Sequence, residues 1–501
     1  MNRSAYIAIA LLAFLSLWQR AGADEVDRYI MQGIDQLYSV RFDDAARSFE
    51  RAIAADRGDP RGYFYRANIH LWGYMFDQRP EQLDLFLKVG DEGIRAAERR
   101  LDANPRDSRA KLFLGMIYGY RAIANAKAEN FMAAAISART CHDRLDEVVR
   151  SDPKAYDAYL GLGLFHFLFG SVPKAAQFMV GLGGIKGDAK LGLREIGTVA
   201  DRGTYFRNDA QLILALLQVY YLDDVNRGLG TLEKIAAKYP KNVAILYVIA
   251  NVYADEYQPA KAIGYYERVI RQGNDDFKMF TDLSYGHCGI AYFMSNDFDR
   301  AKLYLQKFIK NSREKTYRAY AWYLLGLCFE MEGNRANALK AYDYVLKSPG
   351  YSSPEDQAAR RRATVLRKTP PTEGDMLAIR ALNAVEGGDF AAAKNYAHRI
   401  LGGGRPTPDQ RAQAYYALGR ALHEQGDCRG AVKSYGDAIA MGSRRETWIT
   451  PYSYYYMAEC NLKLGDQEKW RTNVGLAKQF SGYDNEQQLR FKMERDVTMI
   501  D

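Results

Sequence analysis

The feature that most constrains this chain is a spacing of small residues that returns along most of its length. A glycine or alanine is followed twelve positions later by an alanine, with large apolar residues at fixed places around both. Gly326 and Ala338 show the spacing, with Trp322, Phe329 and Tyr342 as their large neighbours. The other pairs are Gly33 with Ala45, Gly163 with Ala175, Ala250 with Ala262, Gly289 with Ala301, Ala381 with Ala393, and Gly419 with Ala431. Because small residues let two helices approach closely, the spacing predicts a repeated helix–turn–helix unit.

This unit resembles the tetratricopeptide repeat, which has about 34 residues and a proline near its end. Pro349 stands at that place after the unit around Trp322. The resemblance implies an all-α fold, a right-handed α-solenoid of stacked helix–turn–helix repeats. Two early units reach their prolines, Pro105 and Pro153, late. We therefore expect elongated helices there, one of them starting at Pro80.

A break in the repeat pattern divides the chain. Residues 348–374 contain Pro349, Pro354 and the pair Pro370–Pro371, which interrupt helices. This predicts a linker with a short helix over 348–374. We expect an N-terminal array with the two elongated repeats over 24–347, and a C-terminal array with its cap over 375–501.

The N-terminus has the pattern of a secretory signal. Arg3 precedes an apolar run from Ala5 to Trp18, which is shorter than the roughly 20 residues that span a bilayer. Ala21 and Ala23 form a small-residue cleavage site. We expect a signal peptide over 1–23 and export, with the bacterial periplasm as the destination, since no N-x-S/T sequon follows. The alternative is an uncleaved anchor; other membrane association would be indirect.

Charge and motifs argue against several function classes. The net charge of +8 comes from acidic and basic residues mixed along the chain, so we expect no nucleic-acid partner. The glycine-rich stretch Gly181 to Asp188 lacks the Gly-Lys-Ser/Thr of a phosphate loop. The six histidines are scattered, and neither H-E-x-x-H nor C-x-x-C occurs. We therefore expect no catalytic residue, no metal and no cofactor, and a protein that is not an enzyme.

The five cysteines include two pairs in adjacent repeats. Cys288 and Cys328 are one pair, and Cys428 and Cys460 are the other. Either pair is a possible disulfide in an oxidising compartment. The alternative is that these thiols are buried and fill sites for small residues.

The partner-binding surface is expected on the first helices of the repeats, which line the concave side of such a solenoid. Tyrosine is frequent at these places, and it suits interfaces because it offers a large rigid ring with a polar end. For each residue, packing between helices is the alternative role. The predicted groove residues are Phe64, Asn68, Trp72, Tyr220, Tyr221, Tyr247, Asn251, Tyr320, Tyr323, Tyr416, Arg420, Tyr452 and Tyr455.

Residues from about 155 to 270 carry a narrower resemblance. Gly183 to Asp188, Tyr220 to Asp224, and Lys238 to Asn242 stand in the order found in bacterial exported tetratricopeptide proteins. These are similar to the eukaryotic inclusion-body clearance and mitochondrial outer-membrane tetratricopeptide family. The resemblance implies a helical array that acts through protein contacts.

Three hypotheses of function follow. The first is a non-catalytic scaffold or adaptor of the cell envelope that binds polypeptides through its tyrosine-rich groove. The second is a carbohydrate-binding module in polysaccharide export or uptake, because aromatic grooves also stack on sugars. The third is an enzyme with an unrecognised site.

Overall fold

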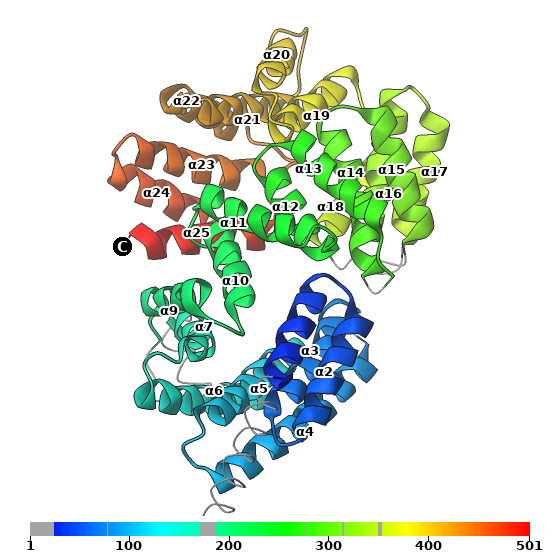
Figure 1. Cartoon of the computed structure of the whole chain (residues 1–501). Helices are drawn as coiled ribbons and strands as arrows, with labels where there is room; N and C mark the ends of the chain where they lie inside the picture. Colours follow the sequence, from blue (N-terminus) through cyan, green and yellow to red (C-terminus); the bar gives the residue numbers. More distant parts are fainter. Residues whose placement is uncertain are drawn as a thin grey trace, which may run out of the picture. The chain divides into compact units, whose positions relative to one another are not determined.

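The computed structural model describes residues 25–77, 79–170, 187–275, 277–312, 315–348 and 353–500. Over these residues the chain is helical and contains no strand, which confirms the predicted all-α solenoid (Figure 1). It divides into two compact units, one up to Ile245 and the other from Leu246 onward. The predicted break over 348–374 lies inside the second of these units. Among the described residues no helix has both the length and the apolar character needed to cross a bilayer.

Unit 1 opens with a helix over residues 25–38. The elongated repeats predicted from the late prolines are present, since α4, α5 and α6 have 24, 20 and 21 residues. Pro80 is the first residue of α4, as predicted. The elements that follow the first helix are α2 (Phe42–Ala55), α3 (Pro60–Asp77), α4 (Pro80–Ala103), α5 (Ser108–Lys127), α6 (Phe131–Ser151), η1 (Tyr156–Ala158), α7 (Tyr159–Gly170), α9 (Ala189–Arg202), α10 (Arg207–Tyr220) and α11 (Val225–Lys238).

Unit 2 contains successive helix pairs, one unpaired helix, α18, and a last helix, α25. Its first helix, α12, begins just before the boundary between the units. The helices are α12 (Val243–Asp255), α13 (Pro259–Gln272), α14 (Lys278–Met294), α15 (Phe298–Asn311), α16 (Arg318–Met331), α17 (Arg335–Lys347), α18 (Pro354–Lys368), α19 (Glu373–Glu386), α20 (Phe390–Leu401), α21 (Pro408–Glu424), α22 (Cys428–Met441), α23 (Ile449–Lys463), α24 (Gln467–Ala477) and α25 (Glu486–Ile500).

The small residues of the repeat lie where two helices of a pair approach most closely. A Cβ atom on Gly326 would come 2.4 Å from a ring carbon of Tyr342, and one on Gly419 would come 2.7 Å from Tyr435. Distances this short leave no room for a methyl group. The structure therefore gives the physical reason for the twelve-residue spacing, since the partner's large side chain fills the space above the glycine.

The turns inside the pairs are built alike. Asn296 and Gly388 take the left-handed conformation, with φ of 58° and 74°. Each is followed by an aspartate, Asp297 or Asp389, whose carboxylate accepts a hydrogen bond from a backbone N–H in the first turn of the next helix. This N-cap satisfies a donor that the helix leaves unpaired. The local sequence thus fixes where each second helix begins.

The unpaired helix α18 belongs to the array before it. It packs against α16 and α17. The Asp356 carboxylate accepts hydrogen bonds from the backbone N–H groups of Tyr317 and Tyr320, at 2.9 and 2.8 Å. The predicted short helix in 348–374 is therefore present, and it packs against the two preceding helices.

Within unit 2 the helices before α18 contact those after it, and we call this contact the seam. Asn383 on α19 donates to the carbonyl of Phe293 on α14 at 2.9 Å. Asn296 donates to the carbonyl of Arg380 at 3.2 Å. A Cβ atom on Gly388 would lie 2.3 Å from the carbonyl oxygen of Tyr257, so the two backbones touch there. The two parts of this unit are joined by backbone contacts and hydrogen bonds.

Candidate functional site: the inner face of the second unit

The predicted groove residues of unit 1 lie mostly in its core. Phe64 and Asn68 are buried, and Phe64 packs edge-on against Phe113 and Phe206 at ring distances of 5.4 and 5.5 Å. This corrects the prediction for these two residues, because core packing leaves them no surface to offer. Trp72 is half-buried and its ring lies 5.6 Å from that of Phe76.

Tyr220 and Tyr221 stand at the end of α10. The side chain of Tyr220 is 44% exposed, whereas Tyr221 is half-buried with its ring against Phe167 at 4.9 Å. Phe64 and Asn68 lie in the core of this unit, whereas Tyr220 is exposed. The structure therefore does not gather the predicted residues of unit 1 into one site.

In unit 2, Tyr247 and Asn251 are half-buried on α12 and join a polar cluster with Tyr266 and His287. Asn251 accepts a hydrogen bond from the Tyr266 hydroxyl at 2.5 Å, and the Tyr247 hydroxyl lies 3.3 Å from a ring nitrogen of His287. Burial lowers the pKa of His287 to about 4, so its ring is neutral at pH 7. The cluster links α12, α13 and α14 by hydrogen bonds. It positions helices and presents little surface.

Arg420 is a charged residue among the deeply buried members of the predicted set. It is 2% exposed, and its guanidinium lies over the ring of Tyr456 at 3.9 Å and that of Tyr257 at 5.3 Å. It donates to the Tyr257 hydroxyl across the seam and pairs with Glu424 at 2.9 Å. A cation packed between aromatic faces and a carboxylate is a structural centre. Arg420 is therefore corrected from a groove residue to a residue that holds the seam.

The remaining five predicted tyrosines of unit 2 differ in how far they are exposed. Tyr323, Tyr416 and Tyr455 are buried, whereas Tyr320 and Tyr452 remain half-exposed. The Tyr320 and Tyr323 rings are 6.3 Å apart on α16, close to Arg362 of α18. The buried members are corrected to core residues with one accessible edge at most. Tyr320 and Tyr452 are the two that keep surface for a partner.

Three carboxylates lie near these tyrosines on different helices. Asp255, Glu386 and Glu459 belong to α12, α19 and α23. Asp255 and Glu386 touch solvent, yet desolvation by the surrounding protein raises the pKa of both, that of Asp255 to about 6. Desolvation likewise raises the pKa of Glu459.

We call the region that contains the half-exposed Tyr320 and Tyr452, the buried Tyr323 and Tyr455, and the carboxylates of Asp255, Glu386 and Glu459 the inner face. The chain's own C-terminal segment contacts it. The Tyr452 hydroxyl donates to the carbonyl of Asn485 at 3.3 Å, and the Tyr455 hydroxyl donates to the Asp496 carboxylate at 2.8 Å. Arg361 and Arg362 both bind Asp484, at 2.5 and 3.0 Å. The structure thus brings these predicted tyrosines together around a polypeptide segment.

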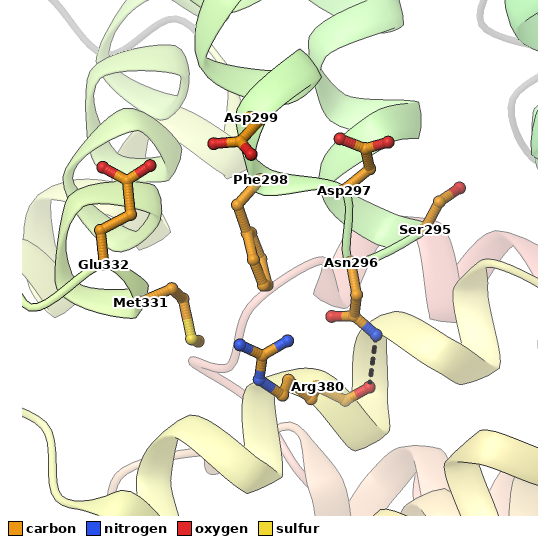
Figure 2. A pocket seen from close by; sticks show the side chains of 8 residues that line it. All are labelled: Ser295, Asn296, Asp297, Phe298, Asp299, Met331, Glu332 and Arg380. Carbon is orange, nitrogen blue, oxygen red and sulfur yellow. Dashed lines mark hydrogen bonds between the residues drawn. The ribbon is translucent and has the colours of Figure 1, made fainter.

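A separate pocket of about 510 Å³ opens at the seam (Figure 2). Its floor carries Arg380, whose guanidinium lies 4.8 Å from the Phe298 ring, and Asn296, which bonds to the Arg380 carbonyl. The carboxylates at its rim are paired within the protein, Asp297 with Arg300 and Glu332 with Lys302. The lining residues are Ser295, Asn296, Asp297, Phe298, Asp299, Met331, Glu332 and Arg380.

Comparison with protein families identifies the repeats. A tetratricopeptide repeat model matches residues 30–71, 142–179, 289–361 and 380–448, and a second one matches 209–242. Together these stretches make up more than half of the chain. The chain belongs to the tetratricopeptide repeat family. Arrays of this family act as scaffolds for protein–protein contacts and are generally non-catalytic.

Solved tetratricopeptide structures cover most of the chain at low identity. Yeast Tom70 is 10% identical with a TM-score of 0.30, and the alignment covers 88% of this chain and 97% of Tom70. A tetratricopeptide repeat protein from Parabacteroides merdae ATCC 43184 is 14% identical with a TM-score of 0.32, covering 60% and 99%. The TPR domain of P58(IPK) is 14% identical with a TM-score of 0.23, covering 89% and 99%. A search of the curated proteins finds no match.

The cysteines of this tetratricopeptide chain are all buried free thiols in the structure. Cys288 and Cys328 lie on α14 and α16, and burial raises the pKa of both thiols. Cys460 faces Cys428, whose thiol adds to the effect of burial in raising the pKa of Cys460. Neither predicted disulfide is formed, and oxidation of the facing pair Cys428 and Cys460 stays a prediction.

Some predictions fall outside the described residues, namely the signal peptide over 1–23 and the glycine-rich stretch up to residue 186. In the part of the chain that the structure describes, no three side chains are arranged to hold a metal ion. The pocket at the seam and the three carboxylates were not found from the sequence. They depend on contacts between helices far apart in the tetratricopeptide array, which no local motif encodes.

Proposed function

We propose that this protein is an exported, non-catalytic scaffold of the cell envelope that binds partner polypeptides on the inner face of unit 2. The observation that carries the proposal is the contact already made there. The hydroxyls of Tyr452 and Tyr455 hold a stretch of polypeptide by its backbone and by a carboxylate. A surface that binds one segment in this manner has the chemistry to bind another.

Export is proposed from the N-terminal sequence and places the scaffold in the bacterial periplasm. The apolar run from Ala5 to Trp18 and the small residues before Asp24 support it. Sequencing the N-terminus of protein from the periplasmic fraction tests this part, and we expect a chain that starts at Asp24. A chain that keeps residues 1–23 and stays with the membrane would instead identify an anchor.

Crosslinking in cells tests the binding surface. The variant Tyr320→Ala/Tyr452→Ala removes the two half-exposed rings and leaves the buried Tyr416 and Tyr455 in place. Tyr344→Ala is the matched control, because Tyr344 is 53% exposed on α17, a second helix of a pair. Circular dichroism and thermal melting first establish that both variants fold as the parent does.

We expect defined envelope proteins to crosslink to the parent and to Tyr344→Ala, and to be lost from the double variant. Equal capture by all three chains would place binding on another surface. No captured protein, together with retention on envelope polysaccharide, would replace the scaffold proposal with the carbohydrate-binding alternative.

A further inference from the structure

The C-terminal segment reaches the inner face through a short connection. After α24 the chain passes through Gly482 and Asn485, which both take the left-handed conformation with φ of 74° and 58°. Asp484 stands between them and pairs with Arg361 and Arg362 of α18. These arginines lie beside Tyr323 of the inner face. The connection therefore directs α25 onto this face and is fixed there by one carboxylate.

The next helix, α25, docks by an apolar stripe. Leu489 and Met493 are four residues apart and fully buried, in a cluster with Tyr455 and Tyr456. Phe491, on another side of the helix, is 57% exposed. Residues four apart share one side of a helix, so α25 is an amphipathic helix that presents Leu489 and Met493 to the array.

A single lysine of α25 faces the carboxylates. The Lys492 ammonium opposes the rise in the pKa of Asp255, of Glu386 and of Glu459, so it lies near all three. It follows Phe491 and precedes the buried Met493. Lys492 shares this environment with Arg420, whose charge also acts on Glu386 and Glu459, so the docked helix brings a second positive charge to an acidic surface.

The polar attachments of this segment are weak compared with those of the seam. The side chains of Arg361 and Arg362 are 43% and 26% exposed, and ion pairs with this access to water contribute about 1 kcal/mol or less each. Arg420, by contrast, is enclosed between rings and a carboxylate. The polar contacts of α25 therefore add little to the burial of Leu489 and Met493, so a ligand that displaces α25 has to replace those apolar contacts.

We propose that α25 is a built-in ligand of the inner face, and that the partner of this face is an amphipathic helix with two apolar residues one turn apart and a lysine or arginine beside them. Such a partner competes with α25 for the same tyrosines and carboxylates. This inference rests on the proposed function, because it names the class of polypeptide that the scaffold binds.

The test uses the full chain and a fluorescein-labelled peptide with the sequence of residues 484–501. In the variant Asp484→Arg/Lys492→Glu, the first substitution places a third positive charge beside Arg361 and Arg362. The second adds a fourth carboxylate to Asp255, Glu386 and Glu459. Hydrogen exchange measures whether α25 has opened while α21 to α23 stay protected. Fluorescence anisotropy then measures peptide binding to the parent and to the variant.

We expect α25 of the variant to exchange faster and the peptide to bind the variant about tenfold tighter than the parent. The reason is that affinity scales with the fraction of molecules whose site is open. The charge-matched control Lys433→Glu/Asp437→Arg on α22 should bind like the parent, and a peptide with Lys492→Glu should bind the opened variant at least tenfold more weakly.

Two results would overturn the proposal: an α25 that stays as protected in the variant as in the parent, or an opened α25 with unchanged peptide affinity. Either result leaves capture of envelope proteins by the parent as a separate observation. Conversely, tight peptide binding without any captured protein would leave the built-in ligand standing and remove the scaffold function.

Discussion

Asp209 on α10 shows how one side chain can make the stability of unit 1 depend on pH. It lies beside the hydroxyls of Tyr38 and Tyr120, in surroundings that burial keeps poor in water. Desolvation raises the pKa of its carboxyl from 3.8 to about 6. The folded state therefore holds this proton more tightly than the unfolded state between those two pH values.

Asp209→Asn should change how the free energy of unfolding depends on pH. In the parent, raising the pH from 4 to 6 forces a charge onto a buried carboxyl, so unfolding becomes easier by on the order of 2 kcal/mol. The asparagine amide cannot ionise, so the free energy of unfolding of the variant does not fall in this way as the pH rises. Urea unfolding at pH 4 and pH 7 measures the effect, and equal pH dependence in both proteins would show that the Asp209 carboxyl is not desolvated.

Arg420→Met should destabilise unit 2 by about 3 kcal/mol, because it leaves Glu424 and the Tyr257 hydroxyl without their buried cation. Arg300→Met is a suitable control, since Arg300 is exposed and its contacts, the Asp297 carboxylate and the Tyr292 ring, belong to the same helix pair. Thermal unfolding of both variants checks the difference. An Arg420→Met variant as stable as the control would mean that the aromatic rings alone hold the seam.

At the scale of a helix pair, the twelve-residue spacing of small residues in the sequence matches the close contacts between the two helices. Gly419 on α21 lies against the ring of Tyr435 on α22. On the same α22, Gly436 has no atom within 4 Å of the place where a Cβ would stand. The two glycines belong to one helix pair but differ in their surroundings, so they separate the packing effect from helix propensity.

Gly419→Ala should lower the free energy of unfolding by about 1–3 kcal/mol, since the added methyl collides with Tyr435. Gly436→Ala should raise it by up to about 1 kcal/mol, because alanine favours the helix and meets nothing. Denaturant titrations give both values. The same sign for the two substitutions would contradict the close approach at Gly419.

The sequence predicts the pairs of helices, the long helices α4 to α6 and the start of α4 because each depends on local spacing or on a single proline. It also indicates Tyr320 and Tyr452, which keep part of their surface in the structure. It misplaces Phe64 and Arg420, which are buried by helices distant in the sequence. The position of a residue within a repeat does not predict which other helices pack against that repeat. Those contacts are what bury the misplaced residues.

For a unit taken as a whole, contacts between helices distant in the sequence stabilise the fold, as does the stacking of neighbouring repeats. In unit 2 the Asn383 amide donates to the Phe293 carbonyl and to the Asn296 side chain, at 2.9 and 3.1 Å. It is buried, so water cannot replace these bonds. One amide therefore ties α14 to α19 across the seam.

Asn383→Ala should cost about 2 kcal/mol of stability, because a buried carbonyl loses its donor. It should also speed hydrogen exchange at the ends of both α14 and α19, whereas Asn337→Ala at the exposed start of α17 should affect neither. Exchange followed by mass spectrometry tests this. Faster exchange at α19 alone would mean that the seam is held by its other contacts.

The seam has a consequence for how this gene can change in evolution. An open repeat array can gain or lose a copy by duplication or deletion, since each repeat needs only its neighbours. In unit 2, Tyr257 must reach Arg420 and Phe293 must reach Asn383. A duplicated or deleted repeat between them would move one partner out of register, so the copy number of this stretch is fixed while its surface residues remain free to vary.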